Sequence, residues 1–210
     1  MTCYPTRASF PLIALASILL GPNFASAQPA TESTTFRIEE TTEPAGWNVF
    51  HGDKRIAGYI QESTGRPIIF PLVGPGGHQM TRGYPMEKAG ENERGDHPHH
   101  KSMWLTHGNV NGTDFWLDRN HAGKIVHRQG TASIDENGAA VIVTENDWVT
   151  KEDEKILSDT RRFAFFEDQG RYIVDCDFLL KATDGDVNFG DTKEGSFGLR
   201  VAGTMKVDAK

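Results

Sequence analysis

The chain has 210 residues, of which 24% are charged and 37% hydrophobic, and its formal net charge is -7. This composition is typical of a globular domain with one buried core, rather than of a disordered or membrane-spanning chain. Because the acidic balance provides no basic surface, we expect neither nucleic acid nor a membrane as a partner.

The first 27 residues have the pattern of a secretory signal peptide. Arg7 supplies a positive charge, residues 10–20 are apolar and too short to span a bilayer, and Ala25 and Ala27 form a small-residue cleavage site. We expect cleavage after Ala27, a flexible tether over 28–35, and export to the periplasm or the medium. Cys3 would be removed with this segment, which leaves Cys176 without a cysteine to pair with.

Short strands are predicted next along the chain. Four candidates, divided by Gly, Pro and Asp, cover residues 35–41, 47–51, 56–61 and 67–73. The following stretch, 74–123, is rich in Gly, His, Pro and Asn and predicts a long His-rich connecting loop. Loops of this length inside a compact domain tend to carry function.

From residue 131 onward, apolar and polar residues alternate with a period of two. The clearest strand is 171–181, and further strands are predicted over 139–150, 162–167 and 198–207. Short polar turns separate most of them, which favours antiparallel pairing. We therefore predict an all-β fold, an antiparallel β-sandwich of supersandwich or jelly-roll type, over residues 36–210.

Seven of the eight histidines lie between His78 and His127. Four of them, His97, His99, His100 and His107, fall within twelve residues of the predicted loop. Pro98 biases His97 toward an extended backbone, so we expect His97 and His99 on one side and His100 on the other. Asp96 is placed to orient one ring. The alternative is that these histidines only bond to backbone carbonyls and shape the loop.

A metal site is a weaker interpretation of the same cluster. Its ligands would be His97 and His99. A jelly-roll metal site of the cupin type adds a Glu a few residues after His-x-His, and no Glu occurs between Glu93 and Glu136. The sequence therefore names no cofactor.

Aromatic and basic side chains accompany the histidines. Trp104 and Trp116, with Tyr84 and Arg82, combine ring faces and hydrogen-bonding groups of the kind that hold a sugar ring. The alternative for the two tryptophans is that they are core residues that pin the loop. The bound partner would then be a carbohydrate or another small molecule.

A second polar group lies at residues 189–200. Asp191, Lys193 and Glu194 stand among three glycines between apolar strand ends, which suggests a bulged strand that aims an acid and a base into a cavity. An ordinary surface turn is the alternative. Proximity to the histidine segment would favour the functional interpretation.

These two segments also resemble a known family. The motifs are 71–77, 80–82, 84–86, 96–100, 107–108, 111–112, 114–116 and 189–195, and they resemble the secreted bacterial PmoA-like family of unknown function. The resemblance implies a galactose-mutarotase-like supersandwich and a role in carbohydrate breakdown. The family takes its name from a methane oxygenase subunit, but that subunit needs several membrane spans, which this sequence does not contain.

Members of that family continue beyond the position of Lys210 with a further part of the sheet. We therefore expect the chain to be truncated relative to the family. If the missing part pairs with the last strand, residues 28–210 alone would expose an unpaired apolar edge and be poorly soluble or oligomeric.

Taken together, the residues predict an exported carbohydrate-active enzyme, a hydrolase, lyase or epimerase. An imidazole would act as acid or base, and a carboxylate would complement it. The candidate catalytic residues are His97, His99, His100, His107, Asp191 and Glu194. The candidate substrate-binding residues are Arg82, Tyr84, Trp104, Trp116 and Lys193. A non-catalytic sugar-binding module and a metal-dependent enzyme are the alternatives.

Overall fold

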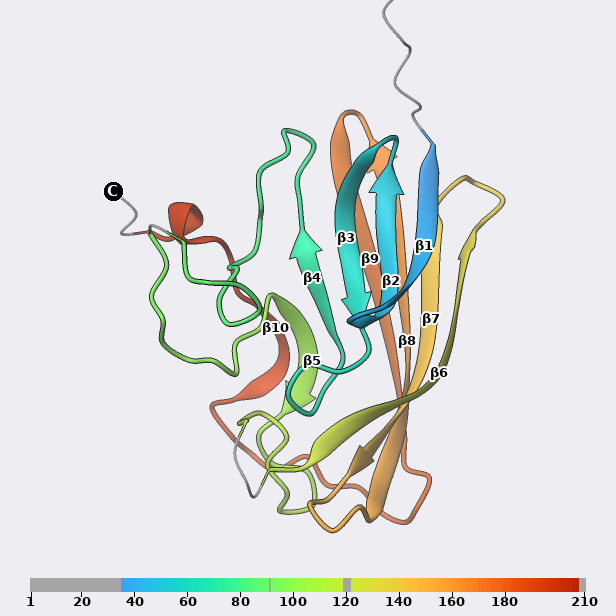
Figure 1. Cartoon of the computed structure of the whole chain (residues 1–210). Coiled ribbons are helices and arrows are strands. Elements are labelled where there is room, and N and C mark those ends of the chain that lie inside the picture. Colours follow the sequence, from blue (N-terminus) through green and yellow to red (C-terminus); the bar gives the residue numbers. More distant parts are fainter. Residues whose placement is uncertain (1–34, 91, 119–121, 208–210) are drawn as a thin grey trace, which may run out of the picture. The chain divides into compact units, whose positions relative to one another are not determined.

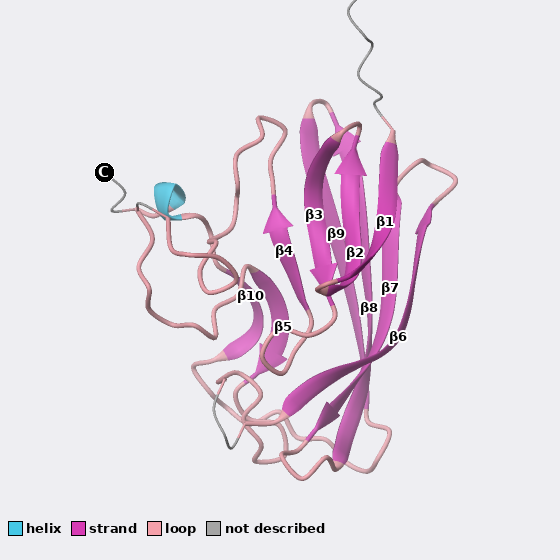
Figure 2. Ribbon diagram, viewed as in Figure 1, coloured by secondary structure: helices cyan, strands magenta, loops and turns pink. Residues whose placement is uncertain are grey.

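The computed structural model describes residues 35–90, 92–118 and 122–207. The expected signal peptide and nearly all of the expected tether lie outside these residues. Within them, the chain forms two antiparallel sheets, which confirms the predicted all-β sandwich (Figures 1 and 2). The only helical element described is a three-residue 3-10 turn, Gly203–Met205, and nothing helical there has the length and apolarity to cross a membrane.

The larger sheet has six strands and the smaller one has four. The order in the first sheet is β1 (Phe36–Thr42), β2 (Ala45–His51), β3 (Lys54–Ile60), β4 (Ile68–Leu72), β5 (Met103–His107) and β10 (Gly195–Leu199). The order in the second sheet is β6 (Lys124–Ile134), β7 (Ala140–Val149), β8 (Lys155–Asp168) and β9 (Arg171–Lys181). Consecutive strands of the second sheet are hairpins, as short polar turns predict.

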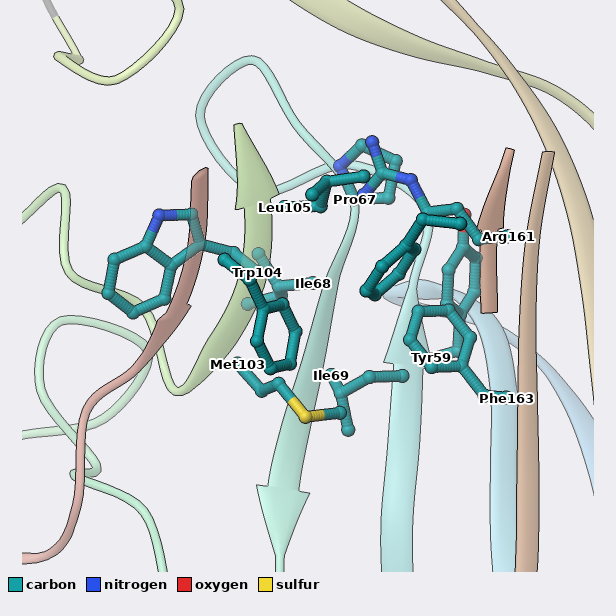
Figure 3. Close-up of a pocket in the computed structure, with 11 residues that line it drawn as sticks. Tyr59, Pro67, Ile68, Ile69, Met103, Trp104, Leu105, Arg161 and Phe163 are labelled. Atoms are coloured by element: carbon teal, nitrogen blue, oxygen red, sulfur yellow. The ribbon is translucent and has the colours of Figure 1, made fainter. Parts of the chain in front are cut away.

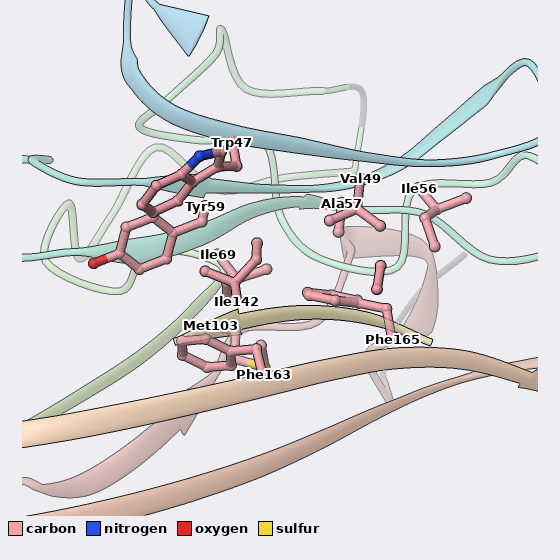
Figure 4. Close-up of a cluster of buried hydrophobic side chains, with 11 residues drawn as sticks. Trp47, Val49, Ile56, Ala57, Tyr59, Ile69, Met103, Ile142, Phe163 and Phe165 are labelled. Carbon is pink, nitrogen blue, oxygen red and sulfur yellow. The ribbon is translucent and has the colours of Figure 1, made fainter. Parts of the chain in front are cut away.

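The main core lies between the two sheets (Figure 4). Val49, Ile69 and Met103 of the first sheet pack against Ile142 and Phe163 of the second. Successive side chains of a strand point to opposite faces, so each strand contributes alternate residues to this layer. Burial of these apolar surfaces is the main source of stability for such a sandwich.

Strand β8 begins at Lys155, well before the predicted residue 162, and β6 begins at Lys124 rather than near residue 131. The early part of β8 was missed because Asp159 and Arg161 lie on its buried face. Their side chains are an ion pair with Nη2 and Oδ2 2.8 Å apart, and Asp159 also accepts a hydrogen bond of 2.6 Å from the Trp148 ring. A satisfied buried pair of this kind hides the apolar period of the strand.

The predicted loop over 74–123 is interrupted by strand β5. Met103 and Leu105 point into the layer between the sheets, whereas Trp104 points to the opposite face of its sheet. In Figure 3, the Trp104 ring is directed away from Arg161 and Phe163, which line a small cavity between the sheets. Nearly every residue of β5 is buried, so the strand lacks the alternation that would have predicted it.

The predicted strand over 198–207 is also wrong. Strand β10 ends at Leu199, Val201 forms an isolated bridge with Thr81, and the 3-10 turn follows. The chain leaves β5 because it pairs with a different partner, the loop around Thr81, where the N–H of Ala202 donates to the carbonyl of Met80 at 2.9 Å. Apolar alternation in the sequence does not distinguish such a loop contact from a sheet strand.

Close approach at one glycine lets β10 pair beside the Trp104 ring. Gly198 is opposite Trp104 in the β5–β10 ladder, and a Cβ atom at Gly198 would lie 2.3 Å from Cζ2 of the indole. Trp104 packs there with Ile68, Phe70 and Trp116 in a second buried cluster. The indole therefore occupies the space that any larger residue at position 198 would need.

We predict that Gly198→Ala destabilises the protein by about 1–3 kcal/mol, since the methyl group overpacks a site that is already filled. The matched control is Gly95→Ala, because a Cβ at Gly95 meets no atom within 4 Å. Chemical denaturation of both variants measures the difference. Equal stability of the two variants would contradict the packing described here.

Candidate functional site

The loop that carries His97, His99 and His100 is organised around Arg82, which is only 2% exposed. All five N–H donors of its guanidinium have acceptors in the same loop. They are the carbonyl of Tyr84 at 3.1 Å, the carbonyl of Arg94 at 3.2 Å, Oδ1 of Asp96 at 3.1 Å, the carbonyl of His97 at 2.8 Å and the carbonyl of His100 at 3.2 Å. No donor is left for a ligand, so the expected contact of Arg82 with a substrate is not supported. Arg82 positions the histidines instead.

The backbone of the histidine segment is a turn, and the predicted extended conformation of His97 is wrong. His97 has a φ of 48°, and the N–H of His100 donates to the carbonyl of His97 at 3.0 Å. This turn directs the carbonyls of His97 and His100 to the guanidinium of Arg82, which an extended segment cannot do. The local preference imposed by Pro98 is therefore overridden by a buried charge-assisted interaction.

The turn brings three imidazole rings together. The ring centroids of His97 and His99 are 5.6 Å apart, those of His97 and His100 are 5.0 Å apart, and those of His99 and His100 are 4.5 Å apart. The expected placement of His100 on the side opposite to His97 and His99 is therefore wrong. We call His97, His99 and His100 the histidine cluster.

Asp96 holds the outer ring of the histidine cluster, as expected from its position in the sequence. Its Oδ2 is 3.2 Å from Nδ1 of His97, and its Oδ1 is 3.6 Å from Nη2 of Arg200. Burial raises the pKa of Asp96, but the hydrogen bond and charge of His97, with Arg200 and Arg82, together lower it below its ordinary value. The side chains of Asp96 and His97 are 39% and 54% exposed, so this pair is accessible to a ligand.

His100 is the ring of the histidine cluster that packs against the two tryptophans. It stacks on Trp104 with a centroid distance of 5.5 Å and meets Trp116 edge-on at 5.6 Å. Burial, followed by the charges of the neighbouring His99, Arg200 and other basic groups, lowers the pKa of His100 to about 4. Its Nδ1 is 3.3 Å from Nη1 of Arg200. His100 is therefore a neutral ring at physiological pH.

The two tryptophans belong to the buried cluster beneath His100. Trp104 is 4% exposed and Trp116 is 7% exposed. Their ring nitrogens and Nε2 of His100 are buried and have no hydrogen-bond partner among the described residues. The faces of these indoles are covered, so their expected stacking on a sugar ring is not supported.

His99 connects the histidine cluster to two acidic groups. Burial lowers the pKa of His99, and the charges of Asp118 and Glu194 oppose this effect. Asp118 is itself held by the buried Lys101, whose Nζ lies 2.8 Å from Oδ2, and by Arg66. Asp118 and Arg200 were not predicted as site residues, because only the folded chain brings them close to the histidines.

The segment over 189–200 runs beside the histidine segment, the arrangement that favours its functional interpretation. Strand β10 pairs with β5, and His107, the last residue of β5, has Nε2 3.0 Å from the carbonyl of Gly190 and Nδ1 3.1 Å from Oγ of Ser196. Both ring nitrogens of His107 thus have partners on the second segment.

The remaining predicted residues differ in their accessibility. Glu194 is half-buried and lies 3.5 Å from the Nζ of Lys193, which is 88% exposed. Asp191 is exposed in the loop before β10. Tyr84 is half-buried, and the guanidinium of Arg82 lies 5.4 Å from the centre of its ring.

The described residues do not provide a metal site. No group of three or more His, Cys, Asp or Glu side chains among them is arranged to hold a metal ion. His97 and His99, the expected ligands, lie close together with His100, but the three rings are not arranged as such a group.

The structure thus defines a β-sandwich with a histidine cluster held on one face of its larger sheet. A model of a family of unknown function, DUF6807, matches residues 46–210, and the chain belongs to this family. No curated protein and no solved structure matches the chain. The family description names no reaction.

The low pKa of His100 gives a pH prediction. In the unfolded chain the pKa of His100 is about 6.5, and in the folded chain it is about 4. The folded state therefore favours the neutral ring, and its stability declines as the pH falls from about 6.5 to about 4. An NMR titration of the ring protons should place the His100 midpoint near 4. A midpoint near 6.5 would contradict the half-buried, stacked position of the ring.

Proposed function

We propose that this chain is an exported, carbohydrate-related enzyme that acts on a glycoside or a free sugar by His/carboxylate acid–base chemistry. The observation that carries the proposal is the contact of three imidazole rings, within 4.5–5.6 Å of one another, next to acidic groups from other segments. General acid–base catalysis needs two groups with different pKa values at one place, and this arrangement supplies them.

The three histidines of the cluster have different proposed roles. His99 is the proposed base, because its lowered pKa keeps it unprotonated near neutral pH. Glu194, whose charge acts on His99, is the proposed complementary carboxylate. His97, oriented by Asp96 at 3.2 Å, is a second proton carrier on the accessible side. His100 stays neutral and supports the other two rings from beneath.

Substrate binding is assigned to the accessible polar groups. Asp96, His97 and Arg200 offer both acceptors and donors, which suits the hydroxyl groups of a sugar. Lys193 is exposed beside Glu194 and extends the same polar surface. Hydrogen bonds, rather than stacking on Trp104 or Trp116, would then determine how the sugar is held.

Three further parts of the proposal come from the sequence. They are export after cleavage at Ala27, the similarity to the PmoA-like family, and the finer galactose-mutarotase-like form of the sandwich. The similarity supports a carbohydrate as the substrate class. The hydrolase, lyase and epimerase reactions remain the candidates for its chemistry.

A non-catalytic sugar-binding module is the alternative function. The exposed Asp96–His97 pair and the nearby Arg200 favour it, because they can bond sugar hydroxyls without any proton transfer. The two functions differ in one outcome. An enzyme changes the glycan or its anomeric form, whereas a module binds it unchanged.

We predict that His99→Ala reduces turnover about a hundredfold or more, the usual size of a general acid–base contribution. The assay incubates the protein with a panel of glycans and free sugars and follows reducing ends and anomeric composition. The matched control is His78→Ala, since His78 is exposed in the same long loop and lies outside the histidine cluster. Thermal melting of both variants separates loss of chemistry from loss of folding.

Two results would refute the enzyme assignment. One is turnover that persists unchanged in the His97→Ala, His99→Ala and His100→Ala variants. The other is tight glycan binding by the wild-type protein with no product, which would establish the binding module instead.

A further inference from the structure

Ser196 and His107 form a hydroxyl–imidazole pair away from the histidine cluster. The Oγ of Ser196 lies 3.1 Å from Nδ1 of His107, within the range for a nucleophile and its base. Ser196 is exposed, so a ligand can reach its hydroxyl group. From the sequence, His107 was expected only as the partner of a carboxylate, and Ser196 was not expected to have a role.

The contact of Nε2 determines which tautomer His107 adopts. Nε2 lies 3.0 Å from the carbonyl of Gly190, and a carbonyl only accepts hydrogen bonds. Nε2 therefore carries the proton of the neutral ring, and Nδ1 presents its lone pair to the hydroxyl of Ser196. A base whose second nitrogen is held by a third group is the arrangement that activates a serine nucleophile.

A glycine allows this close approach. A Cβ atom at Gly195 would lie 2.4 Å from Nδ1 of His107, so a side chain there would displace the ring. The pairing of Gly195 with His107 in the β5–β10 ladder keeps the imidazole beside the residue that follows Gly195. The pair is thus fixed by backbone structure on both strands.

The ladder also directs one backbone donor to the sheet edge. The N–H of Gly108 donates to the carbonyl of Glu194 at 2.9 Å, and the N–H of Arg200 donates to the carbonyl of Ser102 at 2.7 Å. In antiparallel pairing, hydrogen-bonded residues alternate, so Ser196 bonds to β5 and the N–H of Phe197 points away from it. Among the described residues, β10 is an edge strand of the larger sheet, and Phe197 directly follows Ser196 in the chain. A donor at that position can stabilise the oxyanion of an acyl-transfer reaction.

The surroundings indicate the kind of acyl group. The ring of Phe189 lies 5.2 Å from that of His107 and is 40% exposed. This apolar surface suits a short hydrocarbon chain, whereas the neighbouring carboxylates of Glu194 and Asp191 disfavour an anionic substrate. We propose that Ser196 is a nucleophile, activated by His107, that hydrolyses neutral short-chain carboxylic esters.

The reaction has two balanced steps. Oγ of Ser196 forms a bond to the ester carbonyl carbon while its proton moves to Nδ1 of His107. The bond from that carbon to the alcohol oxygen then breaks, and the alcohol leaves with the proton from His107. Water attacks the acyl-serine in the same way, which releases the carboxylic acid and restores the hydroxyl of Ser196.

The test uses a fluorophosphonate probe on the whole chain, with the labelled residue identified by peptide mass spectrometry. We expect one adduct, on Ser196, and none in Ser196→Ala. Ser133→Ala is the matched control, because Ser133 is exposed on β6 and should not react. His107→Gln removes the base but keeps a donor toward Gly190, so labelling should slow about a hundredfold or more. Hydrolysis of p-nitrophenyl acetate should fall in parallel.

Several results would overturn the proposal. They are labelling spread over surface serines, no labelling above that of a denatured sample, or equal rates in the wild type and a folded His107→Gln variant. If His107→Gln does not fold, the pH profile of wild-type labelling decides, because a rate that does not rise as an imidazole loses its proton would contradict the base. The assay uses esters rather than glycans, so its outcome is independent of the acid–base function proposed for the histidine cluster.

Discussion

The buried guanidinium of Arg82 is the interaction on which the histidine cluster depends. A charged group that is 2% exposed is stable only if its donors are satisfied, and here one side chain and four backbone carbonyls satisfy them. Those acceptors fix the backbone at Tyr84 and from Arg94 to His100. The positions of the three imidazole rings follow from that backbone, since each ring is attached to it by a short side chain.

The second constraint is the ladder between β5 and β10. Gly198 admits the Trp104 ring, on which His100 stacks, and Gly195 admits His107 beside Ser196. Two glycines on one edge strand thus support two separate groups of reactive side chains. The residues that flank this strand, Glu194 and Arg200, lie close to the histidine cluster. The sandwich core determines where this strand lies, so the fold and both candidate sites are connected through it.

The all-β architecture could be predicted because it depends on local sequence patterns. The alternation in 171–181 gave β9 to the residue, and polar turns gave the antiparallel order of the second sheet. The N-terminal part of β8 was not predictable in this way, because Asp159 and Arg161 satisfy each other in the interior. Strand β5 was not predicted for the opposite reason: residues on both of its faces are buried, so its sequence shows no alternation.

The candidate site was predicted in composition but not in geometry. The crowding of histidines and the orientation of one ring by Asp96 could be inferred from residues that are close in the chain, and the structure shows that this ring is His97. The turn at His97, the covered faces of Trp104 and Trp116, and the reach of Glu194 and Asp118 toward His99 depend on long-range contacts. No local signal encodes those contacts, so they required the folded chain.

Hydrogen exchange of an Arg82→Lys variant tests the central role of Arg82 most directly. A lysine keeps the charge but cannot bond five acceptors in a plane. The account predicts faster exchange in peptides covering residues 94–101, where the N–H of His100 donates to His97, with unchanged exchange in β7 and β8. Unchanged protection of 94–101 in the folded variant would show that the histidine loop is held by other contacts and would contradict the account.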